Sequence, residues 1–352
     1  MSTGIKGVLS NRLSIASGWS PWLFLPMLLL LSALAALGTG RFAISPDKVF
    51  GILASQVVPL DVFWTETEAR VVMLARLPRI LMAIIVGGGL AMAGAALQGI
   101  FRNPLADPQI VGVSAGAAFG GVLALLLFPS SVLVMLSAFL FGMIALGVVY
   151  WFSHAGGRSL VLMLVLAGVV VGALFGALVS LITYLADPQD ELPAIVFWLM
   201  GSFATASYEK VATVAIPVLA GGMLMYLMRF RINVMSLGDE DAGTLGISVQ
   251  RSRWMVLAGV TAITAATVAV AGVIGWVGLV IPHAARMMTG ADHRTLLPVS
   301  ALLGAIYMLI IDSIARSATA MEIPIGILTA IIGAPVFIVL LKRNKLGGWH
   351  GD

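Results

Sequence analysis

Long apolar runs, separated by short polar segments, follow one another along the chain. A run of about 20 apolar residues makes a helix that can cross a bilayer. The seventh and eighth runs are barely separated, and the glycines and Pro282 in AVAGVIGWVGLVIPH predict that one of the two helices is short or broken. We expect an all-α, polytopic integral membrane protein in which residues 1–352 form a single transmembrane domain. The pattern predicts ten spans: 22–39, 79–100, 110–128, 131–152, 159–186, 209–229, 254–272, 273–289, 297–315 and 325–342.

The first apolar run, Pro21 to Leu37, admits two interpretations. Lys6 and Arg12 precede it and small residues in ALAALGTG follow it, as in a signal peptide with its cleavage site. We favour a first transmembrane helix, because the chain beyond it is itself embedded in the membrane and needs no cleaved leader.

The composition supports a membrane protein and excludes several chemistries. Hydrophobic residues make up 60% of the chain and charged residues only 10%, against about 25% charged in soluble domains. The mean hydropathy is +1.06. The chain has no cysteine, which excludes disulfides and thiolate metal sites. The net charge of +4 fits basic loops at a membrane surface better than nucleic-acid binding.

The basic residues also predict the orientation of the spans. Lys and Arg concentrate in loops that face the cytoplasm. Most of them fall on that side when the N-terminus is inside, whereas most acidic residues fall outside. We therefore expect both termini in the cytoplasm, which agrees with an even number of spans.

Small residues recur at every fourth position in several predicted helices. This spacing puts them on one helix face, where helix backbones can approach closely. Two of the ladders we interpret as packing seams only: Gly87 to Gly99, and Gly112, Gly116 and Gly120. The ladder in the long fifth span is open to a second interpretation, a smooth face that lines a path for a bulky solute: Gly168, Gly172, Gly176 and Ser180.

Two polar segments lie on the predicted cytoplasmic side. In NPLADP, Asn103 to Pro108, the prolines predict a rigid corner, and Asp107 can accept hydrogen bonds from the start of the next helix. In SLGDEDAGTLG, residues 236–246, Asp239–Asp241 predict the first turn of a short helix that ends at Gly246. Ala242 and Leu245 would give this helix a small apolar face. The segment is either a docking element for another protein or an ordinary capped loop.

Arginines mark the predicted outer face. Arg76 and Arg79 stand in RLPR at the outer end of the second span, and Arg316 follows the ninth. Their guanidinium groups can pair with carboxylates of a partner. The alternative is anchoring at the lipid headgroups.

The sequence lacks the residues that several functional classes require. No Walker A motif is present, since GGR at 156–158 lacks the lysine, so ATP hydrolysis by that device is excluded. The four histidines are scattered without metal-ligand spacing, and we expect no metal site. Ionisable residues inside the spans are nearly absent apart from Asp312, which argues against a proton- or sodium-coupled carrier.

Three stretches together resemble the FecCD family of permeases. They are RLPRILMAIIVGGGLAMAGAALQGIFRNPLADPQIVGVSAGA (76–117), GLVIPHAARMMTGADHRTLLPVSALLGA (278–305) and EIPIGILTAIIGAPVFIVLL (322–341). They occur in the family's order and cover nearly the whole chain after residue 40. The loop at 40–78 is longer than the family pattern. The resemblance implies the type II ABC importer permease fold of ten helices.

The resemblance also implies partners and sites. A second copy of the chain, two cytoplasmic ATPase subunits that bind ATP and Mg, and a periplasmic binding protein would complete the transporter. Arg76, Arg79 and Arg316 would meet the binding protein, and the 168–180 ladder would lie near the path. The coupling segment falls at about 230–253, and its residues are Leu237, Gly238, Asp239, Glu240, Asp241, Ala242, Leu245 and Gly246.

The sequence thus predicts a non-enzymatic permease subunit in a bacterial inner membrane that imports an iron chelate, a siderophore or haem, by alternating access. Two alternatives stay open: the same build carrying cobalamin or molybdate, and an ion-coupled secondary carrier.

Overall fold

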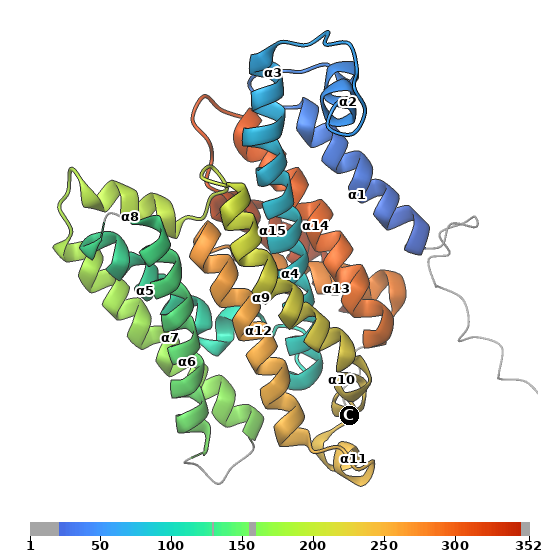
Figure 1. The fold of residues 1–352 in the computed structure, drawn as a ribbon. Helices are drawn as coiled ribbons and strands as arrows, with labels where there is room; N and C mark the ends of the chain where they lie inside the picture. Colours follow the sequence, from blue (N-terminus) through green and yellow to red (C-terminus); the bar gives the residue numbers. More distant parts are fainter. Residues whose placement is uncertain (1–20, 129, 155–159, 346–352) are drawn as a thin grey trace, which may run out of the picture.

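The computed structural model describes residues 21–128, 130–154 and 160–345, and its secondary structure there is helical (Figure 1). The predicted all-α class is therefore confirmed. The helices are α1 (Pro21–Gly38), α2 (Pro46–Ala54), α3 (Glu66–Arg70), η1 (Val71–Arg76), α4 (Leu77–Phe101), η2 (Pro108–Val111), α5 (Val113–Leu127), α6 (Ser131–His154), α7 (Leu160–Leu185), α8 (Glu191–Leu199), α9 (Tyr208–Leu227), α10 (Arg229–Met235), α11 (Asp239–Thr244), α12 (Val249–Ala271), α13 (Val277–Thr289), α14 (His293–Ser317) and α15 (Ile325–Lys345).

Each predicted span coincides with a helix, but the count of ten membrane crossings is not confirmed. Within the described residues, seven helices are long and apolar enough to cross a membrane, while α5 and α15 are shorter apolar helices. Helix α13 has only 13 residues. The count of ten remains a prediction. Lys6, Arg12 and the last seven residues, on which the placement of the termini depends, lie outside the described residues.

The predicted loop at 40–78 is wrong in part. Helix α2 lies within it, and an apolar helix runs without interruption from Glu66 to Phe101. Thr65 and Glu68 form a capping box at its start. Pro78 lies within this continuous helix, because the π-helical turn Val71–Arg76 just before it accommodates a residue that has no N–H to donate.

The predicted break between the seventh and eighth spans is confirmed. Helix α12 ends at Ala271, and Gly272 to Trp276 are non-helical before α13 begins. Gly272 and Trp276 both have positive φ, 70° and 72°. The left-handed conformation is costly for a tryptophan, so its surroundings must hold it there.

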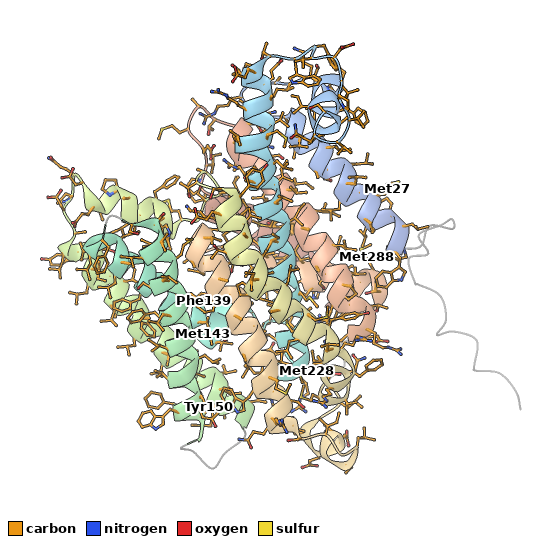
Figure 2. The ribbon with its side chains drawn as sticks, in the orientation of Figure 1. Met27, Phe139, Met143, Tyr150, Met228 and Met288 are labelled. Atoms are coloured by element: carbon orange, nitrogen blue, oxygen red, sulfur yellow. The ribbon has the colours of Figure 1, made fainter. Side chains whose placement is uncertain are left out.

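Helices α4, α12 and α14 form the centre of the bundle. The most apolar stretch of the 66–101 helix and that of α12 are each 78% buried, whereas the corresponding stretch of α7 is 28% buried. Figure 1 shows α5 to α8 gathered on one side of this centre and α1 on the other. On α6 (Figure 2), Leu136 and Leu140 are 61% and 56% exposed, as a lipid-facing surface requires.

Two small-residue ladders are packing seams, as predicted. A Cβ on Gly87 of α4 would lie 2.3 Å from the carbonyl oxygen of Gly304, and one on Gly94, a neighbour of the ladder positions, would lie 1.9 Å from that of Gly278. On α5, a Cβ on Gly120 would lie 2.4 Å from the carbonyl oxygen of Ser137 in α6. Only glycine permits these approaches of backbone to backbone.

Candidate functional site

The segment predicted to dock a partner forms a short helix at one tip of the molecule. Helix α11 begins at Asp239 and carries three carboxylates in its first turn, where they suit the partial positive charge of a helix N-terminus. The chain leaves the helix at Gly246, whose φ is +77°. Figure 1 shows α11 at the bottom of the bundle, beyond the ends of α10 and α12. We call this end the inner end, following the predicted orientation.

Charge pairs fix α11 to the helices behind it. Asp239 accepts a hydrogen bond of 2.8 Å from Arg253, whose side chain is buried, and lies 3.7 Å from Arg102. Gly238 is the N-cap of α11, and its positive φ of 148° turns the chain into the helix. Asp239 therefore connects α11 to both α12 and the end of α4.

The apolar residues of the segment divide into two groups. Ala242 is fully buried, but Leu237 and Leu245 are 65% and 63% exposed. Ala242 and Leu245 thus do not share a face, contrary to the prediction, because Ala242 packs inward. The two exposed leucines give this polar tip an apolar surface that a partner can cover. A hollow of about 400 Å³ lies beside them, lined by Arg231, Gly246, Arg251 and Met255 among others.

The three outer arginines are buried and bonded within the chain. Arg76, Arg79 and Arg316 are each less than 9% exposed. Arg76 donates to the carbonyls of Leu37 and Phe42. Arg316 donates to those of Ala36 and Thr39, at 2.5 and 2.9 Å.

Two of these acceptors, Ala36 and Leu37, are carbonyls of the last turn of α1, which have no partner in the helix itself. Arg76 and Arg316 thus fasten the end of α1 to α14 and to the start of α4.

Arg79 belongs to a buried ionic cluster. Its guanidinium group donates a hydrogen bond of 2.6 Å to Asp312 and forms an ion pair of 2.9 Å with Glu322. Arg316 Nε lies 3.2 Å from the other oxygen of Asp312, so one carboxylate serves two guanidinium groups. An open hollow of about 400 Å³ is lined by all three arginines, Arg41 and Glu322. Docking of a partner by these arginines remains a prediction, and the sequence did not reveal their internal partners.

The glycine ladder of α7 is closely packed in its inner part and open in its outer part. A Cβ on Gly168 would lie 2.2 Å from the carbonyl oxygen of Ile110, and Gly172 approaches Gly112. Gly176 has no atom within 4 Å of such a Cβ, and both it and Ser180 are exposed. The inner part of the ladder is therefore a packing seam against η2, and the outer part is a free face. A path along this face remains a prediction.

The sequence pattern missed one element near the outer end of α7. Helix α8 (Glu191–Leu199) folds back against α5 and α7, and Ile195 is buried there. Its nine residues are too few for the length criterion that identified the spans.

The predicted corner at NPLADP is confirmed, since Asp107 accepts a hydrogen bond of 2.8 Å from the backbone N–H of Gln109. In the described part of the chain, no group of three or more potential metal ligands comes together.

Comparison with known proteins decides among the classes left open by the geometry. A model of the FecCD transport family matches residues 28–343. The chain belongs to the FecCD family. It is thus an ABC importer permease, and the resemblance seen in the sequence is confirmed.

The sequences of similar proteins align with this FecCD permease over almost its whole length. The molybdate import system permease protein MolB of Haemophilus influenzae is 45% identical over 326 residues, 93% of this chain and 96% of that protein. The hemin transport system permease protein HmuU of Yersinia pestis is 36% identical over 329 residues, 92% and 95% of the two chains.

A solved structure described as an inward-facing ABC transporter of metal-chelate type superposes with a TM-score of 0.82 at 44% identity. The match covers 91% of this chain and 98% of the other. The arrangement of helices in Figure 1 is therefore that of an ABC transporter permease.

Proposed function

We propose that this FecCD permease is the transmembrane subunit of an ATP-driven importer that moves an iron chelate, a siderophore or haem, into a bacterial cell across the inner membrane. The family match along residues 28–343 carries the proposal. Relatives named for iron compounds support the cargo, among them HmuU and the Fe(3+)-citrate import system permease protein YfmE of Bacillus subtilis, which is 37% identical over 322 residues.

Molybdate is a second candidate cargo. The observation that favours it is the higher identity to MolB, 45% against 36% for HmuU. The residues proposed to line the path are small or apolar, and no group of metal ligands comes together among the described residues. Such a path does not distinguish between the two cargos. Selection between them would then rest with the binding protein.

The proposed assembly contains two copies of the chain, two ATPase subunits that bind ATP and Mg, and a periplasmic binding protein. Helix α11, with exposed Leu237 and Leu245, is the proposed contact with the ATPase. The ATPase pair closes on ATP, α11 moves with it, and its ion pair to Arg253 transmits that movement to α12. The bundle then opens to the opposite side of the membrane. In this proposal ATP hydrolysis takes place in the ATPase subunits.

The test of cargo uses the transporter reconstituted in proteoliposomes with the ATPase and binding protein encoded beside it. Ferric siderophore, haem, cobalamin and molybdate are compared for binding-protein-stimulated ATP hydrolysis and for uptake. We expect stimulation by an iron chelate. Stimulation by molybdate alone would establish the second candidate, and stimulation by none of the four would contradict the proposed cargo class.

A further inference from the structure

A hollow of about 470 Å³ opens where four separate segments meet, and neither the coupling helix nor the arginines contribute to it. Its lining comes from η2, the end of α8, the non-helical segment Gly272–Trp276 and the first two turns of α15. The polar side chain among the lining residues is Gln109, the second residue of η2.

The hollow reaches into the interior of the bundle. Gly278, two residues after Trp276, approaches the backbone of Leu90 and Gly94 in the centre of α4. A Cβ on Gly333, near the middle of α15, would lie 2.9 Å from the side chain of Trp276. These contacts to α4 and α15 thus place Trp276 inside the bundle, away from the ends of both helices.

Non-helical backbone inside the bundle requires polar partners. In the part of the chain that the structure describes, the amide N–H groups of four consecutive residues, Val273 to Trp276, donate to no protein acceptor. Such groups are tolerated inside a membrane only when they are buried in protein or line a water-filled cavity. Val273, Gly275 and Trp276 line the hollow, which identifies the second situation.

Gln109 adds a side-chain amide to these backbone groups. It is exposed, and its Nε2 would lie 2.7 Å from a Cβ on Gly275. No hydrogen bond joins its side-chain amide to another described residue, and an unpaired amide in hydrocarbon is costly. Its neighbour Ile110 supplies the carbonyl against which Gly168 of α7 packs. The hollow therefore lies across η2 from the ladder of α7.

We propose that Gln109 and the segment Gly272–Trp276 form a polar contact point for the transported solute inside the bundle. The unpaired donors suit a solute that presents oxygen atoms, such as the carboxylate or metal-bound oxygens of a chelate. A mainly apolar path with one such point holds the solute weakly, so that it enters and leaves. This inference rests on the proposed function.

The first experiment measures access by water and does not depend on transport. Because the chain has no cysteine, Gln109→Cys introduces one thiol into each copy of it, and labelling of this chain is measured within the full transporter in proteoliposomes. A charged methanethiosulfonate reagent reacts with thiols in water and not with thiols in lipid. The controls are Leu140→Cys, on the exposed face of α6, and Val122→Cys, which is fully buried. We expect Gln109→Cys to react at least tenfold faster than either; a rate equal to that of Leu140→Cys would overturn the proposal.

The second experiment measures transport by Gln109→Leu, with Gln189→Leu in an exposed outer loop as the matched control. Loss of one hydrogen bond to the solute corresponds to a decrease in uptake of about fivefold, with ATPase co-purification unchanged. Uptake equal to that of the unaltered chain would exclude the contact. If the unaltered chain itself transports no cargo, the proposed function fails, while the labelling rates still show whether the hollow is wet.

Discussion

At the scale of single residues, the arginines at the outer end form ion pairs within the chain, and these pairs stabilise the fold. Asp312 is 1% exposed and lies between Arg79 and Arg316. The sequence singled out the three arginines and Asp312 separately. It could not show that they meet, because Arg79 and Asp312 are 233 positions apart.

Asp312→Asn tests this cluster. The substitution leaves two buried guanidinium groups without their shared carboxylate, and breaking a buried pair costs about 3–5 kcal/mol. We expect a clear loss of monodisperse protein after heating in detergent, followed by size-exclusion chromatography. The control is Glu322→Gln, whose side chain is 29% exposed and should matter little. Equal stability of Asp312→Asn and the unaltered chain would show that the cluster is not a structural element.

Asp292 gives a second, pH-dependent test at this scale. It caps α14, accepts from Asn233 and pairs with Arg294 at 2.6 Å. The hydrogen bond from Arg294 holds the pKa of Asp292 well below its ordinary value of 3.8. A carboxylate with a depressed pKa stabilises the fold above the unfolded pKa, and this contribution disappears as the pH falls through the folded pKa.

We therefore expect Asp292→Asn to melt at a lower temperature than the unaltered chain at pH 7. The difference should shrink as the pH is lowered below about 4. Asp61→Asn, in an exposed loop, is the control and should show no difference at either pH. A melting difference for Asp292→Asn that is the same at pH 7 and pH 3 would contradict the account.

At the scale of the helix, apolar length and small-residue spacing were enough to locate the main elements. Each predicted span coincides with a helix, because a run of apolar residues leaves few alternatives in a membrane. Boundaries were less predictable. The pattern placed a loop before Pro78 where a π-helical turn continues the helix, and it missed α8, which packs in the bundle without crossing the membrane.

Gly94→Ala and Gly176→Ala compare a glycine in a close helix contact with a glycine on a free helix face. The first places a methyl group 1.9 Å from a backbone carbonyl of α13, which must shift. We expect destabilisation of about 1–3 kcal/mol. The second meets no atom within 4 Å and replaces glycine by a better helix former, so stability should be unchanged or higher. Thermal unfolding in detergent measures both, and similar losses in the two variants would refute the distinction.

At the scale of the whole molecule, the account places the contact with the ATPase at α11 and a wet contact point inside the bundle. The sequence predicted the short helix α11, because three carboxylates and a glycine delimit a helix within a few residues; its role in coupling, which the family resemblance implies, stays a prediction. The hollow beside Gln109 could not be predicted, since four distant segments form it.

Leu245→Asp tests the coupling surface. A charge on this exposed leucine leaves the fold intact but disrupts an apolar contact, so ATPase co-purification should decrease at least tenfold. The control is Gly243→Ala on the same helix, where a methyl group meets no other atom. Full retention of the ATPase by Leu245→Asp would place the contact elsewhere.

The most direct measurement of the central claim is uptake by the complete transporter under two driving forces. Proteoliposomes receive either ATP on the side of the ATPase or an imposed proton or sodium gradient without ATP. We predict uptake that requires ATP and the binding protein and ignores the ion gradient. Uptake that follows the gradient in the absence of ATP would contradict the account and establish an ion-coupled secondary carrier.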